Sequence, residues 1–301
     1  MADSPADVRP WWRDPALGTR CELTLRTGRM VTFGAGTGEP IVFVHGLLVN
    51  ANLWRLVVPR LAAGFRCVTL DLPFGSHATS MPDADLTPPG LATLVADAVE
   101  ALGLGPVTLV GNDSGGAVCQ LVATTRPDLV ERLVLTSCDA YDNFPPKAFG
   151  FLKVAARVPG AMMLLNALRS RALRRLPLAY GLLSNRPIPH EAGDSYALPM
   201  CVARDVRDDL RRVLRGLDPR HTLAAARHFA TFDRPVLIAW SQRDRFFPLA
   251  HAERLAGDFP HARLEWIPAA RTFSPEDQPA RLASAITGFV NQTRAPAAEK
   301  R

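Results

Sequence analysis

Short apolar runs alternate along the chain with segments in which apolar residues recur at helical spacing. The apolar runs are 41–44, 67–70, 107–110, 133–136, 236–240 and 263–267. Helical spacing follows them at 52–63, 89–102, 115–125, 249–257 and 279–291. Continuous apolar runs that end in turn residues are typical of strands buried on both faces of a parallel sheet. The alternation therefore predicts an α/β protein with helices on both faces of a mostly parallel sheet.

Two departures from this alternation divide the chain. Residues 21–25 and 30–33, joined by Thr27-Gly28, predict an antiparallel hairpin at a sheet edge. Between 141 and 218 the strands stop, and short helical stretches are separated by prolines. We therefore expect a core at 20–140 and 219–292, an inserted helical cap at 141–218, and terminal extensions at 1–19 and 293–301.

Composition narrows the class of protein. The 301 residues are 48% hydrophobic and 21% charged, which is typical of a globular domain and not of a disordered chain. The formal charge of +6 is local, because residues 141–218 contain thirteen Lys or Arg and seven Asp or Glu. These arginines are separated mostly by Leu, Ala and Val rather than aromatics, which does not favour nucleic-acid binding. Solvated helix faces, or an entrance that favours anions, account for the charge.

The five cysteines are widely spaced, with no Cys-x-x-Cys pair, so neither a disulfide framework nor a zinc site is indicated. We expect no metal and no cofactor. The first fifteen residues lack the apolar stretch of a signal peptide, and no run of about 18 apolar residues predicts a membrane span. The expected setting is cytoplasmic, with a small-molecule substrate, no nucleic acid and no membrane partner; the sequence does not fix the oligomeric state.

A glycine-rich turn follows the apolar run 107–110 and leads directly into a helix: Gly111-Asn112-Asp113-Ser114-Gly115-Gly116. A nucleophile elbow needs this strand-turn-helix context, with small residues two positions before and after the nucleophile. Glycine occupies both positions around Asp113, whereas Asn112 precedes Ser114 and fits less well. A phosphate-binding loop is the alternative, but Asp113 would repel the anion and no Walker lysine follows.

The chain resembles the α/β-hydrolase superfamily over residues 20–292, and its elbow resembles the aspartate-nucleophile branch that includes haloalkane dehalogenases and epoxide hydrolases. The resemblance rests on the elbow, on His45-Gly46, on Asp71 to Gly75, and on the element 240–244 (Trp-Ser-Gln-Arg-Asp). It implies an eight-stranded sheet.

The resemblance also implies roles for individual residues. Asp113 is the expected nucleophile, and the backbone N–H groups of Leu47 and Ser114 the expected oxyanion hole. Asp244 falls where the family places the acid that orients the catalytic histidine. Asp139, just after the run 133–136, is the alternative position for that acid. His45 is expected to be structural.

The expected base is missing. An aspartate nucleophile becomes an ester, and a base must then activate water to release the product. The family places a histidine after the last strand, but here Thr272 stands at that position. A threonine hydroxyl does not take up a proton near neutral pH, whereas imidazole does. His77, in a loop at the same edge of the sheet, is the possible alternate base.

Two further departures bear on the substrate. Dehalogenases carry a tryptophan directly after the nucleophile, where this chain has Ser114, and 141–218 contains no tryptophan. Epoxide hydrolases use two cap tyrosines, and this segment offers Tyr141, Tyr180 and Tyr196. The prediction is a hydrolase acting on a small, largely apolar organic substrate, either haloalkane dehalogenase-like or epoxide hydrolase-like. The alternatives are a lyase, isomerase or cyclase on the same fold, and a catalytically inactive binding protein.

Overall fold

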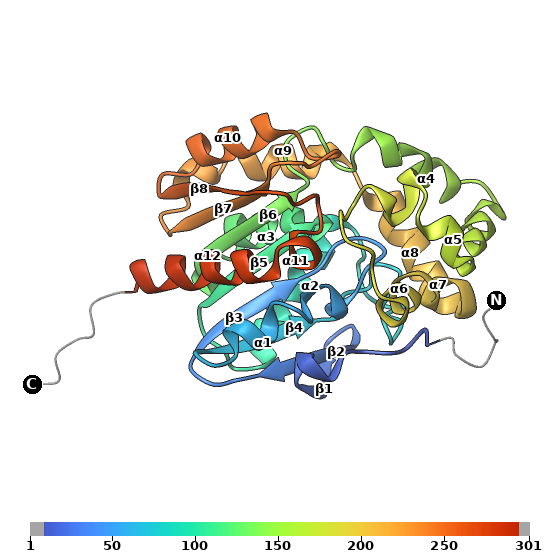
Figure 1. Ribbon diagram of the computed structural model, residues 1–301, viewed down its shortest axis with the longest axis horizontal. Helices are drawn as coiled ribbons and strands as arrows, with labels where there is room; N and C mark the ends of the chain where they lie inside the picture. The colour runs from blue at the N-terminus through green and yellow to red at the C-terminus, as the bar shows by residue number, and fades with distance from the viewer. Residues whose placement is uncertain (1–8, 295–301) are drawn as a thin grey trace, which may run out of the picture.

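An eight-stranded sheet runs through the protein, whose computed structural model describes residues 9–294 (Figure 1). The spatial order is β1-β2-β4-β3-β5-β6-β7-β8. The strands are β1 (Thr19–Leu25), β2 (Gly28–Ala35), β3 (Glu39–Val44), β4 (Phe65–Leu70), β5 (Val107–Asp113), β6 (Val130–Cys138), β7 (Val236–Ser241) and β8 (Ala262–Ile267). Strand β2 is antiparallel to both β1 and β4, and all other pairs are parallel. The predicted mostly parallel sheet and edge hairpin are confirmed.

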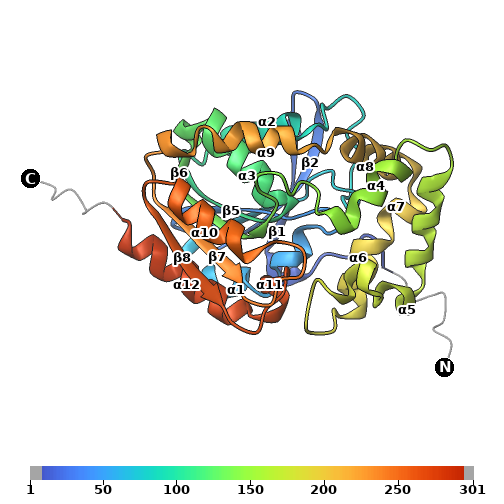
Figure 2. The ribbon, with the colours of Figure 1, turned by 90° about the horizontal axis from the view of Figure 1, so that it is seen from above.

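Helices cover both faces of the sheet because its central strands are apolar on both sides. In β3, Val42 and Val44 pack into one hydrophobic core, while Ile41 and Phe43 pack into the other. The first core includes α2 (Pro88–Ala101), α3 (Ser114–Thr125) and α10 (Leu249–Asp258). The second includes α1 (Val58–Leu61) and α12 (Pro279–Gln292), seen beside the sheet in Figures 1 and 2. Outside residues 141–218 the chain also forms the short helices α9 (Pro219–Ala226) and α11 (Ser274–Asp277).

One predicted helix is wrong in form. The segment 52–63 is not continuous: it is a 3-10 turn, η3 (Ala51–Trp54), followed by the single turn α1. The side chain of Asn50 accepts the N–H of Asn52 and caps the first turn, and Pro59 lies at the start of the second. Proline lacks the N–H that a continuous helix would need there.

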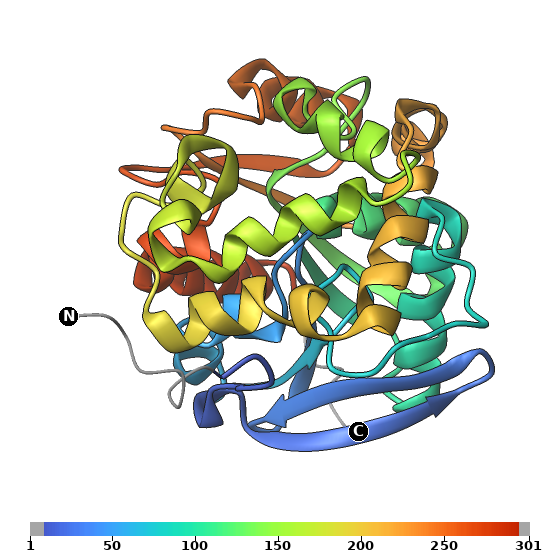
Figure 3. The same cartoon turned by 90° about the vertical axis from the view of Figure 1, so that its right-hand side faces the viewer.

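The segment 141–218, which we call the inserted segment, contains helices and no strand (Figure 3). Its helical elements are η5 (Lys147–Phe149), α4 (Gly150–Ala155), η6 (Ala161–Arg169), α5 (Arg171–Arg174), η7 (Pro177–Gly181), α6 (His190–Ala197), α7 (Pro199–Val202) and α8 (Arg204–Gly216). Figures 1 and 2 both show these helices grouped at one end of the molecule. Nothing in residues 9–294 is a helix long and apolar enough to cross a membrane.

Buried polar contacts attach the inserted segment to the rest of the chain. Asn50 donates to the carbonyl of Ser195 at 2.8 Å, and the Tyr196 hydroxyl donates to Glu276 at 3.0 Å. Removing one partner of such a buried hydrogen bond destabilises the folded protein, because the other polar group stays buried without a partner. These contacts attach α6 of the inserted segment to the residue before η3 and to α11.

Candidate active site

The junction between β5 and α3 has the geometry of a nucleophile elbow. Asp113 lies there with φ 54° and ψ −132°, a backbone conformation that is strained for any residue but glycine. A Cβ added at Gly115 would lie 2.3 Å from the carbonyl oxygen of His45, and one at Gly116 would lie 2.3 Å from Cβ of Cys138. The glycines allow α3 to pass against the neighbouring strands, and the tight turn projects Asp113 from the end of β5.

The Asp113 carboxylate lies against two backbone donors. The N–H groups of Leu47 and Ser114 donate to it. Gly46 lets the loop come this close, because a Cβ there would lie 2.3 Å from Asp113 Oδ2. The expected oxyanion-hole donors thus point at the nucleophile position.

Hydrogen bonds to residues that follow β4 hold the loop that carries Leu47. His45 is fully buried, and its Nε2 accepts the N–H of Leu72 at 3.0 Å. Burial lowers the pKa of His45 to about 4, so the ring is neutral at pH 7. The Leu48 N–H donates to the carbonyl of Phe74 at 3.0 Å. His45 therefore acts as a structural residue of this loop.

Asp113 and Ser114 face a mostly apolar cavity of about 200 Å³. Its walls come from the 47–48 loop, the inserted segment and Phe247, and include Leu48, Phe149, Leu152, Leu165, Leu168, Tyr180 and Leu183. Of the described residues that line it, none is a histidine or a tryptophan. The cavity suits a small, largely apolar molecule.

Burial raises the pKa of Asp113 to about 7, and the nearby Asp244 adds to the shift, while the donors from Ser114 and Leu47 oppose it. Burial also raises the pKa values of Asp139 and Asp244. The structure thus brings the nucleophile candidate and both acid candidates into one electrostatic group of three carboxyls.

Asp139 contacts the elbow itself. The Ser114 hydroxyl donates to its Oδ2 at 3.0 Å, and its backbone N–H lies 3.4 Å from the carbonyl oxygen of Asp113. Its Oδ1 is buried without a hydrogen-bond partner among the described residues. This contact of Ser114 with Asp139 had no signal in the sequence.

Asp244 and Thr272 are hydrogen-bonded partners. Asp244 Oδ1 accepts the N–H groups of Phe246 and Phe247 at 2.8 and 2.9 Å, and the Thr272 hydroxyl at 3.1 Å. Asn112, next to Asp113, donates to the carbonyl of Thr272 at 2.8 Å. Thr272 therefore contacts both Asp244 and the elbow residue Asn112.

His77 is not brought to this group. Its Nδ1 accepts the N–H of Gly75, which leaves Nε2 to donate to Asp209 of α8 at 3.2 Å. It is buried and does not line the cavity. The loop that contains it does end at the same sheet edge, but its side chain joins the loop to the inserted segment instead.

The three tyrosines of the inserted segment are also engaged. Tyr141 donates to Asp258 at 2.9 Å and Tyr196 to Glu276. Tyr180 alone of the three lines the cavity, and its hydroxyl donates to the carbonyl of Leu48 at 2.8 Å. No cluster of three or more His, Cys, Asp or Glu that could hold a metal ion occurs within residues 9–294.

Comparison with known proteins identifies the fold family. Residues 39–279 match the family model described as the α/β hydrolase fold. An uncharacterized protein of Mycobacterium tuberculosis is 28% identical, covering 97% of this chain and 87% of its own, and haloalkane dehalogenase 2 of the same organism is 27% identical, covering 86% and 90%. Among solved structures, haloalkane dehalogenase DbeA of Bradyrhizobium elkani superposes with a TM-score of 0.77 at 21% identity, covering 91% and 98%. The chain belongs to the α/β-hydrolase fold family.

Proposed function

We propose that this protein is a hydrolase that uses Asp113 to attack the carbon of a small, largely apolar organic substrate. The observation that supports this most directly is the Asp113 carboxylate at a strained elbow, facing an apolar cavity and touching the N–H groups of Leu47 and Ser114. A carboxylate oxygen attacks the carbon, the bond from that carbon to its leaving group breaks with both electrons going to the leaving group, and an alkyl ester of Asp113 forms. The second carboxylate oxygen stays with the two donors.

Release of the product requires water to attack the ester carbonyl while a base removes a proton from that water. Asp244 is proposed as the acid that would orient this base, with Asp139 as the alternative, but the side chain between Asp244 and the elbow is Thr272. Without imidazole at that place the second step is slow, and the ester accumulates.

The cavity limits the choice of leaving group. A haloalkane dehalogenase-like reaction is supported by the relatives and the apolar wall, although Ser114 rather than tryptophan follows the nucleophile. An epoxide hydrolase-like reaction needs a donor for the ring oxygen, and the Tyr180 hydroxyl is already bonded to Leu48. Haloalkanes are therefore the first substrate class to test.

A second candidate function is favoured by the pKa of Asp113. A carboxylate whose pKa is about 7 is suited to act as a general base near neutral pH, without becoming an ester. In that case the protein is a lyase, isomerase or cyclase. A catalytically inactive binding protein is the remaining alternative.

Two parts of the proposal concern the molecule as a whole. We interpret residues 141–218 as a cap domain on a core of 20–140 and 219–292, because the inserted segment supplies most of the cavity wall.

All five cysteines are unpaired, and four of them are buried, which supports a reducing, cytoplasmic setting.

Intact-mass spectrometry after incubation with haloalkanes, epoxides and activated esters tests the proposal. We expect a covalent adduct that peptide mapping assigns to Asp113 and that Asp113→Asn abolishes. Conversion of a substrate to an isomer or elimination product without any adduct, again lost in Asp113→Asn, would support the general base instead. Neither adduct nor turnover with any panel member would leave the binding protein as the conclusion.

A further inference from the structure

Exposed apolar side chains are concentrated in one part of the inserted segment. Twelve large hydrophobic side chains are exposed among the described residues, and eight of them lie between Phe151 and Leu178. Leu164 is 77% exposed, Val154 62% and Leu178 57%. Single exposed apolar residues are ordinary on a protein surface, but such a concentration marks a contact surface.

The same stretch is strongly cationic. Residues 147–178 contain seven Lys or Arg and no Asp or Glu. Two of the arginines, Arg171 and Arg174, pair with Asp194 of α6. The stretch therefore presents leucine, valine and phenylalanine side chains among an excess of positive charge, which is the composition of elements that lie on an anionic lipid surface.

This surface also surrounds the entrance to the cavity that contains Asp113. Phe151, Leu164 and Leu178 are exposed and at the same time line the cavity that contains Asp113. An apolar molecule dissolved among lipid acyl chains would meet these side chains before it reached the carboxylate. No other described part of the chain combines exposed apolar residues with the wall of this cavity.

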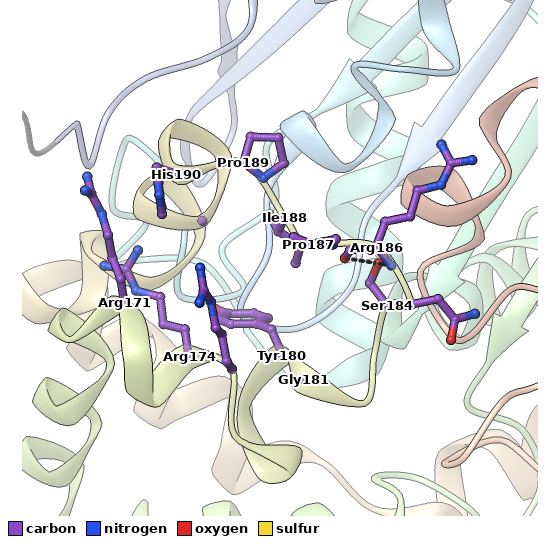
Figure 4. Close-up of a pocket in the computed structure, with 13 residues that line it drawn as sticks. Arg171, Arg174, Tyr180, Gly181, Ser184, Arg186, Pro187, Ile188, Pro189 and His190 are labelled. Carbon is purple, nitrogen blue, oxygen red and sulfur yellow. Dashed lines mark hydrogen bonds between the residues drawn. The ribbon is translucent and has the colours of Figure 1, made fainter.

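A second pocket of about 370 Å³ lies in the same segment (Figure 4), and Tyr180 lines both cavities. Its wall includes Arg171, Arg174, Arg175 and Arg186, together with His190. Arg175 has no carboxylate partner among the described residues, whereas Figure 4 shows the side chain of Arg186 extending away from Arg171, Arg174 and His190. A guanidinium group offers paired donors that match the oxygens of a phosphate.

We propose that residues 147–178 dock the protein on a membrane surface that contains anionic phospholipid, with a headgroup phosphate in the arginine-lined pocket and the mouth of the catalytic cavity facing the acyl chains. Such docking is peripheral and departs from the sequence expectation of no membrane partner. Two copies meeting through this face would bring their cationic stretches together, which opposes self-association. The docking does not depend on what Asp113 does.

Vesicle co-sedimentation of the full chain tests this proposal. We expect binding to vesicles of phosphatidylcholine with phosphatidylglycerol, at least tenfold weaker binding to phosphatidylcholine alone, and weaker binding in high salt. Val154→Asp/Leu176→Asp changes two exposed residues that do not line the cavity. This variant should bind at least tenfold less than the wild type. The matched control Leu223→Asp/Leu249→Asp, with the same charge change outside the stretch, should bind as the wild type does.

A second pair of variants tests the pocket. Arg175→Ala should weaken binding to the anionic vesicles more than Arg227→Ala, which removes the same charge elsewhere. Asp113→Asn should bind as the wild type does, so failure of the catalytic proposal leaves this result intact. Absence of binding to anionic vesicles, equal losses in the variants and their controls, or a dimer that Val154→Asp/Leu176→Asp dissociates would overturn the proposal.

Discussion

The three carboxyl groups at the elbow oppose one another's ionisation. Asp139 is fully buried, Asp113 and Asp244 are partly exposed, and each has a pKa raised first by loss of water. No arginine, lysine or histidine is hydrogen-bonded to any of them among the described residues. A site built in this way holds its reactive group close to the midpoint of its titration at neutral pH.

The first prediction concerns the pH dependence of ester formation. Only the ionised carboxylate attacks carbon, and burial raises the pKa of Asp113 to about 7. The rate of adduct formation with a neutral haloalkane should therefore rise about tenfold per pH unit below 7 and level off above about 8. Single-turnover mass spectrometry between pH 5 and 9 measures it. A rate independent of pH over that range contradicts the assignment.

The second prediction links the same group to stability. In the unfolded chain the Asp113 carboxyl ionises from about pH 4, whereas in the folded protein it stays protonated up to about pH 7. Its raised pKa therefore lowers the free energy of unfolding as the pH rises, and the loss is greatest above pH 7. Asp113→Asn removes the charge and should raise the melting temperature, by more at pH 8 than at pH 5. Calorimetry at the two pH values measures the difference. An equal change in melting temperature at the two pH values would contradict the prediction.

The third prediction concerns the missing base. Thr272→His places an imidazole beside Asp244 and the elbow, so it should shorten the lifetime of the Asp113 adduct by about 10²- to 10⁴-fold. Thr272→Val removes the hydroxyl but adds no base, and should leave the lifetime nearly unchanged. Time-resolved intact mass measures both decays. If the wild type already turns over repeatedly, another base is present and Thr272→His should gain little.

At this scale the glycine spacing and the resemblance lead to two site predictions, Asp113 as the nucleophile and Thr272 in place of the base, and both stay predictions. The structure adds that the Thr272 hydroxyl donates a hydrogen bond to Asp244. The sequence could not indicate that His77 is hydrogen-bonded to Asp209 or that Ser114 is hydrogen-bonded to Asp139. Those contacts depend on how the inserted segment and β6 pack, which no local pattern contains.

At the scale of elements, the elbow requires close packing of α3 against neighbouring backbone as well as an unusual backbone conformation at Asp113. A Cβ at Gly115 would meet the carbonyl oxygens of His45 and Val44 at 2.3 and 2.5 Å. Both are backbone atoms, at the end of β3 and at the start of the loop that supplies the Leu47 N–H, so α3 or that backbone would have to move. Shape complementarity at the start of α3 therefore fixes the donor geometry.

The fourth prediction follows from this contact. Gly115→Ala should destabilise the protein by about 3 kcal/mol or more, because overpacking here meets backbone rather than a flexible side chain. It should also slow adduct formation on Asp113. Gly257→Ala is the matched control: it lies within α10 with no atom within 4 Å of the added Cβ, and should be neutral or stabilising by up to about 1 kcal/mol. Urea unfolding measures both.

The central strands were predictable because burial on both faces leaves uninterrupted apolar runs, as at Ile41–Val44. Their ends were not, since β6 extends to Cys138 and β5 to Asp113 through polar residues. The segment 52–63 shows the opposite case. Its apolar spacing fits a helix, yet Asn50 and Pro59 divide it into two short turns.

At the scale of the whole molecule, one buried ion pair connects three distant parts of the chain. Arg55, in the turn between η3 and α1, donates to Oε2 of Glu276 in α11 at 2.8 Å, and Tyr196 of α6 donates to Oε1 at 3.0 Å. Arg55 is 3% exposed, Glu276 4% and Tyr196 fully buried. The position of the inserted segment over the cavity thus depends on charges that no sequence pattern pairs.

The fifth prediction is that Arg55→Met destabilises the protein by about 3–5 kcal/mol, because it leaves the Glu276 carboxylate buried without its cation. Arg55→Met/Glu276→Leu should recover much of that loss, since removing both charges leaves no buried ion unpaired. Arg204→Met, which removes an exposed ion pair with Asp208, should cost less than about 0.5 kcal/mol. Urea unfolding of the four proteins provides the comparison. Equal effects of Arg55→Met and Arg204→Met would show that the buried pair does not hold the inserted segment in place.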